Sequence, residues 1–305
     1  MEHDHDHGHR HGPHAGAGSA AMAALLDLDA DVLHSYLSDV IEWVWQQAAG
    51  TPRHRVLDLG AGTGTGTIAL ARRFSGATVI AVDQSEEMLA RVRAKALARG
   101  LADRVRTVRA DLEVAWPVIE PVIESAIEPV IEPVDVVWAS NSLHEMADPG
   151  PVLQAAYAAI RPGGLLAVAE MDAPPRFLPD DLGLGRPGLE SRCHDALEPE
   201  PSGAEPRLAP DWGRRLVRAG FTLAARRTFV TDLPAPLPAS AGRYAQAYLQ
   251  RIRPVLEDRM AADDLATLDT LIDSDGPDGL LNRADLMVCG ARTAWIARRP
   301  PAPSR

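Results

Sequence analysis

The sequence predicts an α/β protein built around a largely parallel β-sheet. Short runs rich in β-branched residues alternate with helical stretches, and a glycine-rich segment directly follows the first run. Strands that alternate with helices are joined by right-handed crossovers into a parallel sheet. With 305 residues and 46% hydrophobic content, the chain can bury one large core, so we expect one elaborated domain over residues 22–300.

The alternating elements occupy residues 53–172, which we expect to form a cofactor-binding core. Predicted strands of five or six residues are separated by stretches in which apolar residues recur at the spacing of a helix. The predicted strands are His54–Leu59, Thr78–Val82, Val105–Arg109, Val134–Trp138 and Leu165–Glu170, and the predicted helices are Thr65–Phe74, Ser85–Arg99 and Pro151–Ile160.

The N-terminal region divides into a polar tail and a helical cap. Residues 1–21 carry six histidines among Asp, Gly and Ala, too little apolar surface to fold, so we predict a disordered, solvated tail. Imidazole and carboxylate groups can bind transition metals, but nothing fixes a geometry, and we assign no metal site. Residues 22–50 contain an amphipathic helix, Ala24–Gln47, which packs on the core and, in a second interpretation, walls a substrate pocket with Tyr36 and Trp43.

One segment of the core breaks the alternation of strands and helices. Residues 117–134 repeat a Pro-Val-Ile-Glu unit, and such frequent proline forbids a helix there. A period of four matches neither a strand face nor a solenoid. We interpret the segment as an extended insertion from repeat expansion rather than a site.

Residues 173–300 are expected to complete the sheet and to form the substrate side. Residues 174–210 are rich in Pro, Gly, Asp and Glu and predict a long loop or partial lid. The later elements are a helix at Trp212–Ala219, a strand at Phe221–Val230, mostly helix over Arg243–Ile272 and a last strand at Arg292–Arg298. The acidic segment 273–279 lacks the EF-hand ligand frame and is predicted to be a plain loop.

Charge and cysteine content limit the partners. The net charge of −11 repels polyanions, so nucleic acid is excluded as the expected substrate. Cys193 and Cys289 fit no zinc or disulfide framework. No stretch approaches about 18 apolar residues, and the N-terminus has no apolar signal core, so we expect a cytoplasmic protein without a membrane partner. The oligomeric state stays open.

The main chemical signal is the loop Gly60-Ala61-Gly62-Thr63-Gly64 after the first strand. Glycines allow a sharp turn and close approach to a ligand. The second strand ends at Asp83, where a carboxylate can accept hydrogen bonds from both ribose hydroxyls, which indicates an adenosine-containing cofactor. A G-x-G-x-x-G frame starting at Gly60 ends at Thr65, and one starting at Gly62 ends at Thr67. The loop therefore disfavours a nicotinamide-dependent oxidoreductase.

A family resemblance rests on motifs that follow one another along residues 50–172. They are Asp58-x-Gly60-x-Gly62-x-Gly64, then Asp83, then Ala110-Asp111-Leu112, with Asp135–Asn141 on the fourth strand and Arg161-Pro162-Gly163-Gly164 before the fifth. This series resembles the cofactor signature of class I S-adenosylmethionine-dependent methyltransferases. The resemblance implies a Rossmann-like sheet of seven strands, mostly parallel with the last strand antiparallel, helices on both faces, and extra helices at both ends.

The resemblance also implies roles for particular residues. The Gly60–Gly64 loop would lie under the methionine and ribose parts of S-adenosylmethionine, and Asp58 would meet the methionine amino group. Asp83 would hold the ribose, Gln84 and Met88 would border the adenine, Asp111 and Leu112 would contact its amino group and edge, and Asn141 would complete the cofactor set. Gln84 and Met88 could instead serve only to pack the helix that they begin.

Candidate catalytic residues follow from where ligands bind in open parallel sheets, outside the carboxyl ends of the strands. Positioning alone supplies much of the catalysis of methyl transfer, but a hydroxyl or protonated amine acceptor needs a base. His144 and Glu145 follow the fourth strand, and Glu170 ends the fifth, with Asp172 just beyond. The alternative for His144 is a hydrogen-bonding role at a helix start. Tyr244 and Tyr248 share a helix face that either packs in the core or lines a pocket.

The sequence thus predicts S-adenosylmethionine-dependent methyl transfer to the O, N or C nucleophile of a small-molecule acceptor. A protein acceptor is the nearest variant. A module that binds S-adenosylmethionine without turnover, a nicotinamide-dependent oxidoreductase and a metal-delivery role for the histidine tail are the alternatives. Fold alone does not decide among them.

Overall fold

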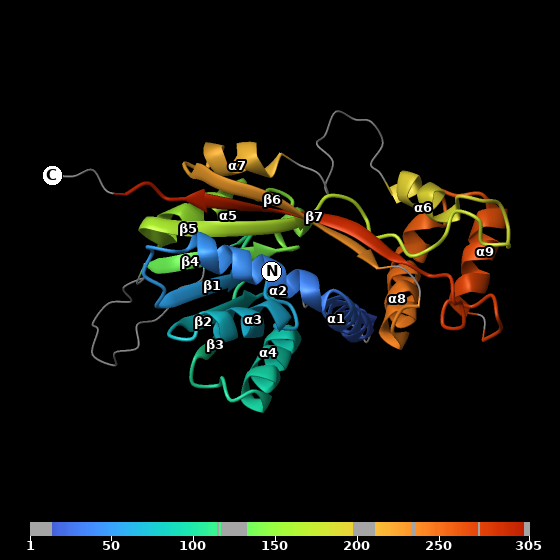
Figure 1. The fold of residues 1–305 in the computed structure, drawn as a ribbon, viewed down its shortest axis with the longest axis horizontal. Helices are drawn as coiled ribbons and strands as arrows, with labels where there is room; N and C mark the ends of the chain where they lie inside the picture. The colour runs from blue at the N-terminus through green and yellow to red at the C-terminus, as the bar shows by residue number, and fades with distance from the viewer. Residues whose placement is uncertain are drawn as a thin grey trace, which may run out of the picture.

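The computed structural model describes residues 14–114, 116, 133–197, 211–233, 236–273 and 275–301. A seven-stranded sheet forms the centre, in the order β3-β2-β1-β4-β5-β7-β6 (Figure 1). The first five strands run parallel, and β7 pairs antiparallel with both β5 and β6. This arrangement confirms the predicted fold. The strands are β1 (Arg55–Leu59), β2 (Thr78–Asp83), β3 (Val105–Arg109), β4 (Val134–Ser140), β5 (Ile160–Met171), β6 (Thr222–Leu233) and β7 (Val288–Arg298).

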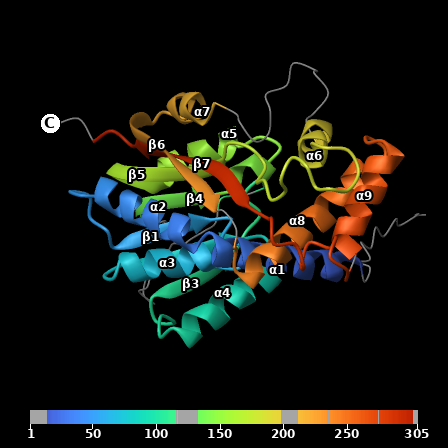
Figure 2. The same ribbon diagram turned by 45° about the vertical axis from the view of Figure 1, so that its right-hand side comes forward.

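Helices cover both faces of the sheet and also extend beyond one end of it. In Figure 2, α2, α3 and α4 lie on one side of the strands and α7 on the other, while α6, α8 and α9 lie together beyond the sheet. The helices are α1 (His14–Val32), α2 (His34–Gln47), α3 (Thr65–Arg73), α4 (Glu86–Ala98), α5 (Gly150–Ala159), α6 (Leu189–Leu197), α7 (Trp212–Arg218), α8 (Ala239–Leu256) and α9 (Ala262–Asp273), with a 3₁₀ turn, η1 (Leu143–Glu145).

The central strands are buried on both faces because helices cover both sides. Successive side chains of a strand point to opposite faces. Val56 and Val136 belong to the cluster that includes α2, α3 and α8, whereas their neighbours Leu57 and Val137 belong to the cluster that includes α5 and α7. The two clusters enclose the sheet and hold its carboxyl edge in place. Within the described ranges, no helix is long and apolar enough to span a membrane.

The N-terminal region differs from the single predicted helix. The chain bends at Leu33, which has φ −100° and ψ 28°, so that α1 and α2 are separate helices. Helix α1 begins at His14, inside the segment 1–21 that we expected to be disordered. Asp27 and Asp29 on this helix bind groups of distant elements, described below, and such contacts cannot be read from local composition. Residues 1–13 of the predicted tail lie outside the described residues.

The C-terminal half also contains structure that the sequence reading missed. Helix α6 lies within residues 174–210, where a loop was predicted, because the buried Glu190 carboxylate accepts hydrogen bonds from the backbone of Phe177 and Leu178. The long helical stretch is two helices, α8 and α9. The last strand begins at Val288, earlier than expected. Most of the predicted insertion, residues 117–132, lies outside the described residues.

Candidate active site

The glycine-rich loop makes a tight turn between β1 and α3. Gly60, Gly62 and Gly64 all have positive φ, at 68°, 52° and 83°. A Cβ on Gly60 would lie 2.5 Å from Ser142 Cβ, so a side chain there would collide with the loop after β4. The backbone nitrogens of Gly60 and Ala61 both donate to Val82 O, at 2.9 and 3.0 Å. Glycine is therefore required by backbone conformation and by close approach.

Asp83 connects this loop to the start of α4. Its Oδ2 accepts a hydrogen bond from Gly62 N at 2.9 Å, and its Oδ1 accepts one from Ser85 N at 2.9 Å. Ser85 in turn caps α4, because its hydroxyl accepts from Met88 N. Each carboxylate oxygen keeps a further acceptor position for a ligand. Backbone donors thus hold the Asp83 carboxylate, which we predicted to bind the ribose, in a fixed position.

Asp58 is buried at the base of the loop. It is 3% exposed, and its Oδ2 accepts a hydrogen bond from Thr67 Oγ1 at 2.6 Å. Burial raises the pKa of the Asp58 carboxyl to about 7, and the charge of Asp83 adds to this, while the Thr67 bond only partly opposes it. A cationic ligand group beside Asp58 would favour the ionised form.

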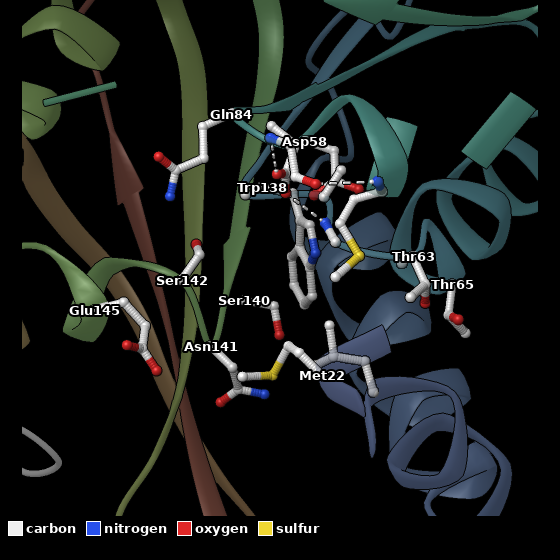
Figure 3. A pocket seen from close by; sticks show the side chains of 18 of the residues that line it. Met22, Asp58, Thr63, Thr65, Gln84, Trp138, Ser140, Asn141, Ser142 and Glu145 are labelled. Carbon is white, nitrogen blue, oxygen red and sulfur yellow. Dashed lines mark hydrogen bonds between the residues drawn. The ribbon is translucent and has the colours of Figure 1, made fainter. Parts of the chain in front are cut away.

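The predicted cofactor residues gather around one cavity of about 490 Å³, a size typical of small-molecule sites. Figure 3 shows side chains from β1, the glycine loop and the loop after β4 converging on it. The predicted residues that line it are Asp58, Gly60, Ala61, Gly62, Thr63, Asp83, Gln84, Met88, Asp111, Leu112 and Asn141. Met88, in the first turn of α4, and Gln84, just before the N-cap Ser85, therefore both line the cavity.

Gly64 is the exception among the predicted cofactor residues, because it does not line the cavity. It stands just before α3 and faces α4 instead, where a Cβ would lie 2.7 Å from Val92 Cγ2. A glycine is needed at position 64 because α3 packs closely against α4 there.

The candidate catalytic residues separate in the structure. Glu145 lines the cavity, but His144 and Glu170 do not. His144 Nδ1 lies 2.6 Å from Glu170 Oε2, and the other oxygen of Glu170 accepts hydrogen bonds from Ser142 N and Leu143 N. The pair therefore organises the turn after β4, which is the hydrogen-bonding alternative for His144.

The protonation of His144 supports the same conclusion. Burial lowers the pKa of the imidazole, but hydrogen bonds and charge from Glu145 and Glu170 outweigh it and raise the pKa to about 9. His144 Nε2 lies 3.4 Å from Glu145 Oε1, so both ring nitrogens face carboxylates. An imidazolium held in this way has no lone pair with which to accept a proton from a substrate.

Helix α1 forms one wall of the cavity, and its second half belongs to the stretch Ala24–Gln47, for which a pocket wall was the second interpretation. It contributes Ser19, Met22, Leu26, Asp29 and Ala30 to the cavity, and the following residues Leu33, Tyr36 and Leu37 continue the wall; Ser140, Trp138, Ser142 and Arg292 also line it. Tyr36 was a predicted wall residue, whereas Trp43 is buried in the core and does not line the cavity. Tyr244 and Tyr248 pack against Phe177, as the core interpretation expected.

A polar network fastens α1 to the glycine loop. Asp27 Oδ1 accepts hydrogen bonds from Thr63 Oγ1 and Lys95 Nζ, both at 2.6 Å. Lys95 also donates to Thr65 Oγ1 at 3.1 Å. The contacts join α1, the loop and α4. A signal was present in the sequence, because acidic residues recur on an otherwise apolar helix, but their partners could not be identified from sequence.

The cavity is strongly acidic. Among the described lining residues, six carry carboxylates and one carries a guanidinium: Asp29, Asp58, Asp83, Asp111, Glu113, Glu145 and Arg292. Such a lining attracts cationic ligands and disfavours anionic ones. No three His, Cys, Asp or Glu side chains gather as metal ligands within the described ranges, and most of the histidine-rich tail lies outside them.

Comparison with known proteins agrees with this arrangement. A family described as a methyltransferase domain matches residues 57–166, which include the end of β1, the glycine loop, β2, β3 and β4. Over residues 57–166 the chain is thus similar to this methyltransferase domain family, and its sheet has the fold of a class I methyltransferase. S-adenosylmethionine is the methyl donor of this family.

The matches to similar proteins span only part of the length of those proteins. A demethylmenaquinone methyltransferase from Thermus thermophilus is 33% identical over 153 residues, which are 48% of this chain and 62% of that protein. A 27-O-demethylrifamycin SV methyltransferase from Amycolatopsis mediterranei is 29% identical over 182 residues, 57% of this chain and 61% of that protein. The chain thus spans about three fifths of these relatives.

Among solved structures, one of a candidate methyltransferase from Bacillus halodurans is similar with a TM-score of 0.51 and 19% sequence identity. The match covers 85% of this chain and 98% of that chain. At this identity the likeness concerns the fold.

Proposed function

We propose that this protein transfers a methyl group from S-adenosylmethionine to a nucleophilic O, N or C atom of a small molecule. The observation that carries the proposal is the acidic cavity at the carboxyl ends of β1, β2 and β4, lined by the motif residues of the family. S-adenosylmethionine contains two cationic groups, a sulfonium and an ammonium, and one carboxylate, so its net charge is positive. A site lined mainly by carboxylates suits such a molecule.

Individual groups of the cavity also fit this cofactor. Asn141 has a positive φ of 49°, and its Oδ1 is buried without a hydrogen-bond partner among the described residues. A buried acceptor without a partner is costly, so a ligand donor such as an ammonium would be stabilised there. Asp58 would accept from the same ammonium group, and Asp83 would hold the ribose hydroxyls.

The bound cofactor supplies an activated methyl group on a good leaving group. The protein's residues must therefore mainly align the acceptor and exclude water. Helix α1 and the start of α2 close one side of the cavity for this purpose. Where the acceptor must lose a proton, Glu145 is the candidate, because it lines the cavity and the other predicted candidates, His144, Glu170 and Asp172, do not.

The alternatives are less well supported. A nicotinamide cofactor contains a pyrophosphate, whose negative charge would meet the carboxylates of the cavity. A non-catalytic S-adenosylmethionine-binding module would share the cofactor site and would be recognised by tight binding without product from any acceptor. The cytoplasmic location stays a prediction, and the free thiols of Cys193 and Cys289 agree with it.

The first test is calorimetric titration of the full chain with S-adenosylmethionine, S-adenosylhomocysteine and NAD. We expect micromolar binding of the two sulfur compounds and none of NAD. Asp83→Ala should weaken this binding about tenfold or more, equivalent to about 1.4 kcal/mol.

Exposed Asp103 lies outside the cavity and supplies the control, Asp103→Ala, which should bind as the wild type does. Thermal unfolding of both variants separates ligand loss from misfolding, because Asp83 also holds Gly62 and Ser85. If neither sulfur compound binds the wild-type protein, the proposal is wrong.

A further inference from the structure

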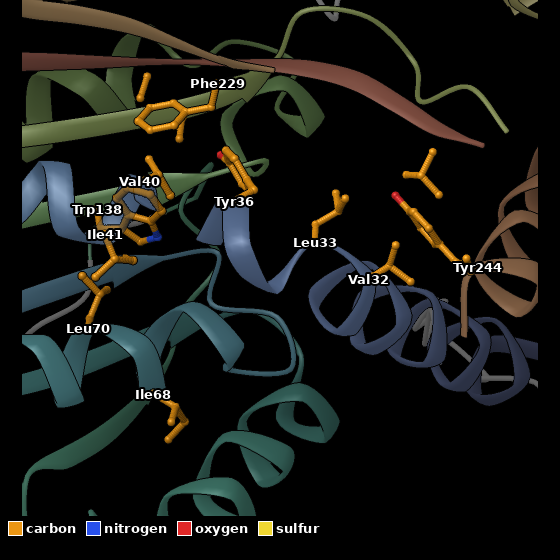
Figure 4. Packing of buried hydrophobic residues seen from close by; sticks show 14 of the residues in the cluster. Val32, Leu33, Tyr36, Val40, Ile41, Ile68, Leu70, Trp138, Phe229 and Tyr244 are labelled. Atoms are coloured by element: carbon orange, nitrogen blue, oxygen red, sulfur yellow. The ribbon is translucent and has the colours of Figure 1, made fainter. Parts of the chain in front are cut away.

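Tyr36 combines deep burial with a polar atom that has no partner. The residue is 7% exposed on α2 and lines the cavity, and its Oη makes no hydrogen bond among the described residues. Figure 4 shows it where α1 meets α2, with Phe229 on one side and Leu33 on the other. A buried hydroxyl without a partner costs free energy, so a group of a ligand is expected to satisfy it.

The Tyr36 hydroxyl acts as a donor. Burial raises its pKa to about 12, with Asp29 and Glu170 adding to the effect and the charge of Arg292 opposing it. The guanidinium of Arg292 lies 4.8 Å from the ring centroid and can only donate toward the hydroxyl oxygen, so the phenolic proton has no acceptor among the described residues. The phenol is therefore protonated and oriented by its ring contacts, and it would donate to an oxygen of the ligand.

Arg292 is already paired with a carboxylate. Its Nη2 donates to Asp29 Oδ1 at 2.5 Å, its Nη1 donates to Asp29 Oδ2 at 3.3 Å, and Tyr244 donates to the same Oδ1 at 2.6 Å. The pair is electrically neutral and closes α1 against β7 and α8. The other charged residues that line the cavity, within the described ranges, are carboxylates.

The remaining wall around this position is apolar. Leu33 and Leu37 flank Tyr36 on α2 and its preceding turn, and Met22 and Ala30 extend the apolar surface along α1. An apolar wall with one hydroxyl donor and no free positive charge recognises an uncharged molecule with one oxygen acceptor.

We propose that the methyl acceptor is an uncharged, largely apolar molecule, and that Tyr36 Oη donates a hydrogen bond to its hydroxyl or carbonyl oxygen. This inference rests on the proposed methyltransferase function and adds the class of acceptor. The Asp29–Arg292 pair excludes carboxylate and phosphate acceptors because it neutralises the one guanidinium described in the cavity lining.

The test uses the full chain saturated with S-adenosylhomocysteine, titrated calorimetrically with 2-naphthol and with 2-naphthoate at pH 7.5. These probes share one ring system, but the first is neutral and the second is an anion. The wild-type protein should bind 2-naphthol at least about tenfold more tightly than 2-naphthoate. Tyr36→Phe should weaken 2-naphthol binding about fivefold, equivalent to about 1 kcal/mol, without changing affinity for S-adenosylhomocysteine.

Tyr157→Phe makes the same chemical change on α5, across the sheet from Tyr36 and outside the cavity lining, and should bind both probes as the wild type does. Absence of 2-naphthol binding, equal binding of 2-naphthoate, or unchanged 2-naphthol binding by Tyr36→Phe would overturn the inference. Loss of S-adenosylhomocysteine affinity in Tyr36→Phe would place Tyr36 at the cofactor instead and overturn it too. Failure of the wild type to bind S-adenosylhomocysteine would instead contradict the proposed function itself.

Discussion

Asp58 shows how one buried residue can couple ligand binding to protons. In the ligand-free protein its pKa is raised from 3.8 to about 7, chiefly by burial, so the carboxyl is mostly protonated below pH 7. A raised pKa contributes stability that is present below about pH 4 and is lost as pH rises through about 7. A cationic ligand reverses the preference, because it stabilises the carboxylate.

We therefore expect binding of S-adenosylmethionine to release a proton below pH 7. Its affinity should rise about tenfold or more between pH 5.5 and pH 7.5, because the cost of ionising Asp58 disappears over that range. The range ends below the pKa of an α-amino group, about 7.7–8.0. Calorimetry in buffers of different ionisation enthalpy measures the proton released.

Asp58→Asn is the matched control and should bind more weakly at every pH without releasing this proton. Glu190 has a pKa raised to about 7 by burial, but it does not line the cavity. Its ionisation should therefore not change on binding. An affinity for the wild type that does not vary with pH would contradict the role of Asp58.

At the scale of elements, the start of α3 shows why the glycine loop cannot be replaced. Gly60 and Gly62 face the cavity, whereas Gly64 lets α3 approach α4. A side chain at Gly64 would be strained by φ +83° and would also meet Val92 Cγ2 at 2.7 Å and Val92 Cα at 3.0 Å. The signature glycines thus serve two purposes, ligand approach and helix packing.

Gly64→Ala should destabilise the protein by about 2–4 kcal/mol, from left-handed strain and overpacking together. Gly50 supplies the control, because it has φ +79° but nothing within 4 Å of a Cβ. Gly50→Ala should cost only the conformational part, roughly 1–2 kcal/mol. Urea unfolding of both variants measures the difference, and equal losses would show that Val92 moves aside without cost.

At the scale of the whole molecule, the N-terminal helix is fastened across the cavity at two points. Asp27 binds Thr63 and Lys95 on the cofactor side, and Asp29 binds Arg292 and Tyr244 on the opposite side. These contacts bring residues near the two ends of the chain together. The cavity is therefore complete only when α1, β7 and α8 have assembled.

A double-mutant cycle measures this connection. Arg292 is 9% exposed, so Asp29→Asn leaves a buried charge without its partner and should cost about 3–5 kcal/mol of unfolding free energy. Adding Arg292→Met should recover about 1–3 kcal/mol relative to the sum of the single changes.

The exposed pair Glu86–Arg93 is the control cycle, with side chains 57% and 48% exposed, and its coupling should be close to zero. Urea unfolding gives both couplings. Coupling energies that are equal for the two pairs would show that the Asp29–Arg292 pair does not hold the molecule together.

Features that depend on local sequence were predicted, whereas features that depend on contacts between distant residues were not. The five parallel strands and the helices after β1 and β2 were predicted because their periodicity is local. Asp83, Met88 and Asn141 line one cavity because motif spacing fixes where strand ends meet, and their contacts with the cofactor stay a prediction. Helix α6 was missed because its support comes from Glu190 bonding to a distant backbone segment, and proline-rich composition hid it.

The sequence by itself determined the fold class and the glycine loop, since these depend on local periodicity and backbone conformation, and it predicted cofactor residues from the order of motifs at the strand ends. Tertiary structure alone decided which residues of α1 wall the cavity, that His144 pairs with Glu170, and that Arg292 meets Asp29. Each of these contacts joins residues 26 to 263 positions apart. Such contacts depend on packing of the assembled core, which no local pattern encodes.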